Sequence, residues 1–113
     1  MTSRRPTALE RAVALAYGGR LNAASRLLDA QHARGDEVLW LRAYLRTATG
    51  SFARAESAAR TVLARTADPR LRARSAITLG SVLRQTGRHA EARRIEAGAL
   101  RGTLISELRA HLH

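Results

Sequence analysis

The chain has 113 residues, of which 45% are hydrophobic and only 4% aromatic, and it contains no cysteine. This length suits one domain and not two, and the missing cysteines exclude disulfides and thiolate metal sites. No apolar run reaches the length of a membrane span, and the N-terminus carries no apolar segment typical of a secretory signal. We therefore expect a cytoplasmic protein without a membrane partner.

The charge balance is the extreme feature of the composition. The formal net charge is +11 at pH 7, and all 20 basic residues are arginine. Such an excess attracts nucleic acid, acidic protein surfaces or anionic membranes. However, the absence of lysine together with 23 alanines is also typical of a coding sequence rich in G and C. Both explanations of the arginines stay open at this point.

The N-terminal half predicts a disordered arm at residues 1–6 and then four helices. Thr7 and Glu10 have the spacing of a capping box, which starts the first helix. Gly35 ends the second helix, and Asp36 is expected to cap the third. The four helices are expected at about 7–17, 21–33, 37–48 and 52–65.

The C-terminal half predicts three further helices. Asp68 and Pro69 form a strong start signal, with Asp68 as the cap and Pro69 at the first helical position. Gly102 and Thr103 are expected to separate the sixth helix from a last amphipathic helix. Its apolar residues, which would cover the end of the stack, are Leu104, Ile105, Leu108 and Leu112. The three helices are expected at about 69–85, 89–100 and 103–112.

Three glycines mark an internal repeat, because Gly19, Gly50 and Gly87 are 31 and 37 residues apart, a mean of 34. A small residue stands seven positions before each glycine, and an alanine stands five positions after it. Antiparallel helices approach closely only where both carry small side chains, and glycine suits the left-handed conformation that ends a helix. The small residues are Ala12, Ala43 and Gly80 before the glycines and Ala24, Ala55 and Ala92 after them.

This pattern resembles the tetratricopeptide repeat, a helix-turn-helix unit of about 34 residues. The third unit resembles it most closely, with Leu79 and Gly80 standing where the family has its Leu-Gly pair. The resemblance implies an all-α, right-handed superhelix of three antiparallel helix pairs with a seventh, capping helix. It also implies that the first helix of each pair lines a concave groove. The repeats would span about 7–34, 36–67 and 69–101, with the cap at 103–112, in one domain over 7–113.

No residue pattern predicts reaction chemistry. The four histidines include no i, i+4 pair with a nearby carboxylate, which a zinc hydrolase helix requires. The chain also lacks a phosphate-binding loop and a dinucleotide fingerprint. We therefore expect no catalytic residue, no metal site and no cofactor, and the sequence argues against an enzyme.

Two groups of residues are candidates for partner binding. Trp40 and Tyr44 lie one turn apart on the third helix, away from its other apolar face, and we expect them in the groove or at a dimer contact. Core packing is the competing explanation for this helix. The second group is a basic face of the fifth helix that contains no carboxylate. Its members are Arg70, Arg74, Ser81, Arg84 and Arg88.

The sequence therefore predicts a noncatalytic scaffold that binds an acidic protein or peptide, or a second copy of itself, through this groove. The alternative is sequence-tolerant nucleic-acid binding, for which positive charge suffices. Against it stand the few aromatic residues for base stacking and the scatter of arginines around most helices.

Overall fold

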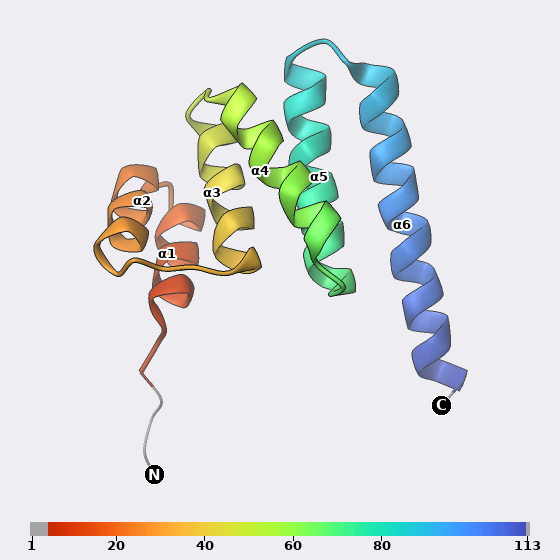
Figure 1. Ribbon diagram of the computed structural model, residues 1–113, viewed down its shortest axis with the longest axis horizontal. Helices are drawn as coiled ribbons and strands as arrows, with labels where there is room; N and C mark the ends of the chain where they lie inside the picture. Colours follow the sequence, from red (N-terminus) through yellow and green to blue (C-terminus); the bar gives the residue numbers. More distant parts are fainter. Residues whose placement is uncertain (1–4, 113) are drawn as a thin grey trace.

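The structure, a computed structural model, describes residues 5–112, with side chains described for residues 5–102. This part of the chain is entirely helical apart from turns, and its helices follow one another in a row (Figure 1). Within it, no helix is both long and apolar enough to cross a bilayer. The six helices are α1 (Ala8–Tyr17), α2 (Leu21–Ala30), α3 (Asp36–Ala48), α4 (Phe52–Arg65), α5 (Pro69–Gln85) and α6 (His89–Leu112).

Two helix starts carry the predicted caps. Thr7 Oγ1 accepts a hydrogen bond from the Glu10 amide at 3.1 Å, and the Asp68 carboxylate accepts one from the Arg70 amide at 3.0 Å. These side chains satisfy amides that have no partner within the helix. The prediction that Asp36 caps α3 is wrong, because Gly35 occupies the cap position and Asp36 is the first helical residue. The Asp36 carboxylate instead forms an ion pair with Arg65 of α4, with Oδ1 3.3 Å from Nη2.

The end of α2 also differs from the prediction, since the helix stops at Ala30 and not near residue 33. His32 adopts a left-handed conformation with φ 47°, and the Ala33 amide donates to the Leu28 carbonyl at 3.0 Å. This bond closes the helix end in the way that a glycine usually does. No glycine or proline directly follows Ala30 to signal the end of α2. The helix predicted from the sequence was therefore too long.

The three predicted glycine turns have one geometry. Gly19, Gly50 and Gly87 have φ values of 83°, 85° and 83°. In each turn, the amide after the glycine donates to the carbonyl five residues earlier, which is the closure of a Schellman motif. These bonds are Arg20 to Leu15 at 2.8 Å, Ser51 to Arg46 at 2.8 Å and Arg88 to Leu83 at 2.7 Å. The three glycines that repeat in the sequence therefore mark three turns with the same structure.

The helices pack as neighbouring pairs, α1 with α2, α3 with α4 and α5 with α6. The small residues around each turn are all buried, as the repeat predicts: Ala12, Ala24, Ala43, Ala55, Gly80 and Ala92. Because α3 also contacts both α1 and α5, these three helices form one layer, and α4 packs against α5. The stack measures 41 × 38 × 23 Å, with a radius of gyration of 15.2 Å, against about 13 Å for a compact globule of this length.

The prediction of a seventh, capping helix is wrong, because α6 continues through Gly102 and Thr103 to Leu112. Gly102 does not adopt a positive φ, and a glycine inside a helix costs only about 1 kcal/mol relative to alanine. A single glycine is therefore too weak a signal to end α6. The apolar side chains assigned to the cap lie outside the described side chains, and residues 1–4 of the predicted arm lie outside the described residues.

Candidate interaction surface

A strip of side chains crosses the layer that α1, α3 and α5 form. The Tyr17 and Tyr44 rings meet edge to face, with centroids 5.9 Å apart and planes at 82°. The Tyr44 ring lies 6.1 Å from that of Trp40, and the guanidinium carbon of Arg74 lies 5.3 Å from the Trp40 centroid. Ile77 follows Arg74 by one turn on α5. We name these five residues the aromatic strip.

Trp40 is the buried member of the strip and does not contribute to its exposed surface. The residue is only 4% exposed, and its Nε1–H donates to Thr78 Oγ1 at 3.2 Å in the interior. The prediction that Trp40 faces a partner is therefore corrected: it is a core residue, which was the competing explanation. Tyr44 is half-buried and Arg74 is exposed, so a partner of this face would contact these two side chains above the indole.

Two exposed apolar members of the strip were not among the predicted binding residues. Tyr17 on α1 is 63% exposed and Ile77 on α5 is 62% exposed. Large apolar side chains at this exposure are typical of interaction sites when other apolar groups adjoin them. The signal for Ile77 was present, because an isoleucine stands between Arg74 and Ser81 on a face otherwise predicted to be polar.

The predicted basic face of α5 divides into two parts. Arg70 and Arg74 have no carboxylate partner within residues 5–102, whereas Arg84 forms an ion pair with Glu96 of α6. Arg88 pairs with carboxylates of α4 and α6. The expectation of an uncompensated arginine face is therefore wrong for Arg84 and Arg88. Ser81 is half-buried and accepts a hydrogen bond from Gln85 Nε2 at 3.2 Å.

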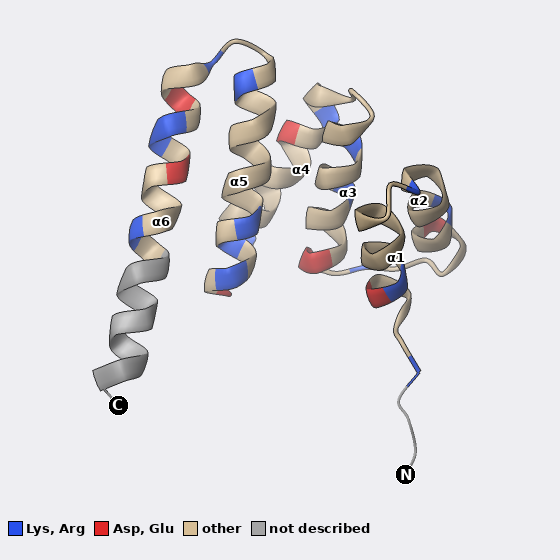
Figure 2. Ribbon diagram, turned by 180° about the vertical axis from the view of Figure 1, so that it is seen from behind, with Lys and Arg blue, Asp and Glu red and all other residues tan. Residues whose placement is uncertain are grey.

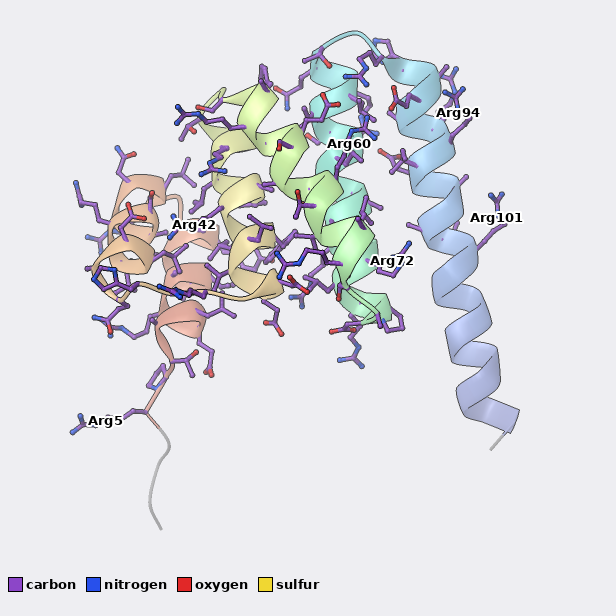
Figure 3. All side chains as sticks on the ribbon, in the orientation of Figure 1. Arg5, Arg42, Arg60, Arg72, Arg94 and Arg101 are labelled. Carbon is purple, nitrogen blue, oxygen red and sulfur yellow. The ribbon has the colours of Figure 1, made fainter. Side chains whose placement is uncertain are left out.

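Arg88 belongs to a closed ring of four ion pairs that fastens α6 to α4; Figure 3 labels Arg60, the α4 arginine of this ring. Each arginine bridges both glutamates, which satisfies several donors at once. Burial raises the pKa of Glu56, but hydrogen bonds from Arg60 and Arg88 outweigh burial and hold this pKa below the ordinary glutamate value. The same two arginines lower the pKa of Glu91. The bonds are Arg60 to Glu91 at 2.6 Å, Arg60 to Glu56 at 3.0 Å, Arg88 to Glu56 at 2.8 Å and Arg88 to Glu91 at 2.9 Å.

Charge is not uniform along the edge of the α1, α3 and α5 layer. Figure 2 shows basic residues gathered at the start of α5, acidic residues at the start of α3, and both signs at the start of α1. Glu37 lies in the first turn of α3, and Arg70 and Arg74 lie in the first turns of α5. A negatively charged ligand on this face is therefore favoured at α5 and opposed at α3.

Within the part of the chain with described side chains, no three histidine, aspartate or glutamate residues are placed to hold a metal ion. No family model, curated protein or solved structure matches the chain. The function is therefore inferred from the geometry and charge of the surface itself.

Proposed function

We propose that this chain is a noncatalytic interaction module, a stack of three tetratricopeptide-like repeats that binds an extended acidic peptide across α1, α3 and α5. The observation that supports it is the aromatic strip. Tyr17 on α1 and Ile77 on α5 provide exposed apolar side chains. Arg74 on α5 provides a positive charge next to the Trp40 ring.

Arg74 suits a peptide carboxylate because of how it is held. Its guanidinium contacts the Trp40 ring by cation–π interaction, which leaves N–H donors at its edge free for a carboxylate. A side chain that is already ordered loses less conformational entropy when it binds. Arginine and carboxylate can also pair through two hydrogen bonds, which adds directional preference.

The peptide would lie across the helices, because the strip does so. Its carboxylates would occupy the α5 end, next to Arg70 and Arg74, and its apolar residues would contact Ile77, Tyr44 and Tyr17. Carboxylates toward α3 would meet Glu37 instead. An extended backbone on this exposed face keeps its hydrogen bonds with water, so it needs no strand edge to pair with.

One observation favours a second candidate, nucleic-acid binding. Arg93, Arg94 and Arg101 are exposed on α6 and have no carboxylate partner among residues 5–102, so they are available for phosphates. The aromatic side chains that would stack on bases lie on other helices, and Trp40 is buried. Because these arginines and the aromatic side chains lie on different helices, we prefer peptide binding to nucleic-acid binding.

The experiment uses a fluorescent peptide in which leucine and glutamate alternate, titrated with the protein and two matched variants. Ile77→Ser removes an exposed apolar side chain from the strip, and Leu100→Ser removes one of equal exposure, 62%, from α6. We expect Ile77→Ser to weaken binding about tenfold, as at a typical hot spot, and Leu100→Ser to leave it unchanged. Equal affinity of both variants would reject the strip as the binding site.

A further inference from the structure

A groove separate from the aromatic strip lies between α4 and α6, with α5 as its floor. Its volume is about 750 Å³, within the range of about 300–1,000 Å³ that is usual for ligand pockets. Leu63 of α4, Leu79 of α5 and Ile95 of α6 give it an apolar lining. Its charged lining residues are all arginines, Arg60, Arg72 and Arg94, and no carboxylate lines it within the described side chains.

Among the described side chains, the ion pairs that join α4 to α6 lie at one end of the groove. The ring of ion pairs joins them at Arg60 and Glu91. Beyond this point, the facing residues on α6 include Gly98 and Gly102, and a Cβ added at either would meet no atom within 4 Å. Ala64 stands opposite on α4. Side chains of this size leave the space between the two helices open.

The small residues of the groove match those with which this chain packs its own helices. Each of the three turns is flanked by a buried small residue on the helix before it and a buried alanine on the helix after it. In the groove, the same residue types face a space that no described helix fills. A helix satisfies its own backbone hydrogen bonds, so it can enter an apolar groove that offers no backbone partners. The occupant that fits is therefore a helix.

The charge of the rim specifies the chemistry of that helix. Arg60 is already paired within the ring, but Arg94 has no ion-pair partner within the described side chains. Arg72 uses a single nitrogen, Nη1, for the carbonyls of Leu63 and Thr66 at 2.6 and 3.3 Å. Figure 3 labels Arg60 on α4, Arg72 on α5 and Arg94 on α6, and all three line the groove. The rim thus offers donors to carboxylates.

We propose that this groove docks a short amphipathic helix from an acidic partner, with its apolar face on the half-buried Leu63 and Ile95 and its carboxylates on Arg72 and Arg94. A second copy of the chain, itself with a net charge of +11, would bring arginine toward arginine. The groove runs along α6 from Arg94 to Gly102, which is about 12 Å at 1.5 Å per residue. It therefore accepts about two helical turns.

The probe is a synthetic helical peptide with leucines at the i, i+3, i+4 and i+7 spacing and glutamates elsewhere, labelled for fluorescence anisotropy. Gly98→Leu fills the groove with a residue of higher helix propensity, so the fold is retained. Arg94→Glu reverses the charge at the rim, and Arg93→Glu makes the same charge change at the adjacent residue, which does not line the groove. We expect Gly98→Leu and Arg94→Glu each to weaken binding at least tenfold, and Arg93→Glu to change it less than twofold.

Two results would overturn the proposal. One is wild-type protein that does not bind this peptide at low salt, and the other is Gly98→Leu protein that binds it as well as wild type. Sedimentation of the protein alone is the further control, because self-association that Gly98→Leu abolishes would assign the groove to a second copy. The peptide-binding proposal for the strip is tested independently, since Ile77→Ser is expected to leave the helical peptide unaffected and Gly98→Leu to leave the alternating peptide unaffected.

Discussion

Arg74 and Trp40 come from different helix pairs, and the guanidinium carbon of one lies 5.3 Å from the ring centroid of the other. Trp40 also donates to Thr78, which lies one turn from Arg74 on α5. One face of α5 thus both covers the indole and fixes its N–H. Arg74 therefore has two roles at this contact. It covers the Trp40 side chain of the core, and it is the side chain that we propose binds a peptide carboxylate.

Replacing Arg74 tests its role in covering Trp40. Arg74→Ala removes the cation–π contact, so we expect a loss of about 0.5–1 kcal/mol in the free energy of unfolding. The single tryptophan of the chain reports the change directly, because water that reaches the indole shifts its emission to longer wavelength. Arg70→Ala is the matched control on the same helix and should alter neither quantity. Equal emission and stability in the two variants would contradict the covering role of Arg74.

The hydrogen bond beneath the strip is a second test. Thr78→Val leaves the buried Trp40 N–H without an acceptor, and we expect this to cost about 1–3 kcal/mol in urea unfolding. Thr78→Ser keeps the hydroxyl and removes only a methyl group, so its loss should be smaller. If valine were tolerated as well as serine at this position, the bond would contribute nothing to stability.

The helix boundaries were largely predictable because the signals for them are local. The bounds of α4 and α5 agree with the prediction, since Gly50, Asp68, Pro69 and Gly87 act on their own neighbours. The long-range pairs were not predictable. Arg88 lies 32 residues from Glu56 in sequence, so no helical spacing relates the two residues. The sequence therefore predicted a basic face without carboxylate partners, whereas the fold places carboxylates next to it.

Two further features could not be predicted from the sequence. They are which face of α3 is buried and which neighbouring side chain requires a glycine at position 80. The periodicity of α3 shows two apolar faces but not which of them α5 covers, and so Trp40 was placed outside. Gly80 was predicted as a small residue at a helix crossing. The structure adds its neighbour: a Cβ at this position would lie 2.8 Å from Cδ of Glu96, so the glycine makes room for the carboxylate that pairs with Arg84.

Two glycines with different backbone conformations should change stability in opposite directions when replaced by alanine. Gly87 has φ 83°, so Gly87→Ala places a side chain in the left-handed region at a cost of about 1–2 kcal/mol. Gly98 is helical and its added Cβ meets nothing within 4 Å, so Gly98→Ala should stabilise by about 0.5–1 kcal/mol. Thermal unfolding of both variants checks the pair. Equal shifts in the same direction would contradict the assignment of Gly87 to the turn.

The ring of ion pairs predicts how stability depends on pH. Hydrogen bonds from Arg60 and Arg88 lower the pKa of Glu56 and of Glu91 from the ordinary glutamate value. The stabilisation from both groups is therefore fully present above about pH 4.5 and is lost as the pH falls through the lowered folded values. Urea unfolding measured from pH 7 down to acid should show this loss in wild type.

The Glu56→Gln variant should lose part of this acid dependence, because it removes one of the two titrating groups. Glu37→Gln is the control, since Glu37 has no ion pair within residues 5–102 and should leave the dependence unchanged. Added salt should reduce the difference between wild type and Glu56→Gln, because the ring is only partly buried. An identical pH profile for wild type and Glu56→Gln would exclude the ring as its source.

The most direct test of the central claim compares two labelled ligands, the alternating leucine and glutamate peptide and a generic single-stranded RNA, by anisotropy at low and near-physiological salt. The account predicts that the peptide stays bound at the higher salt, since apolar contacts at Tyr17 and Ile77 do not depend on ionic strength, and that the RNA is released. RNA that stays bound, with log affinity falling linearly against log salt, and a peptide that does not bind would show instead that the arginines serve phosphates.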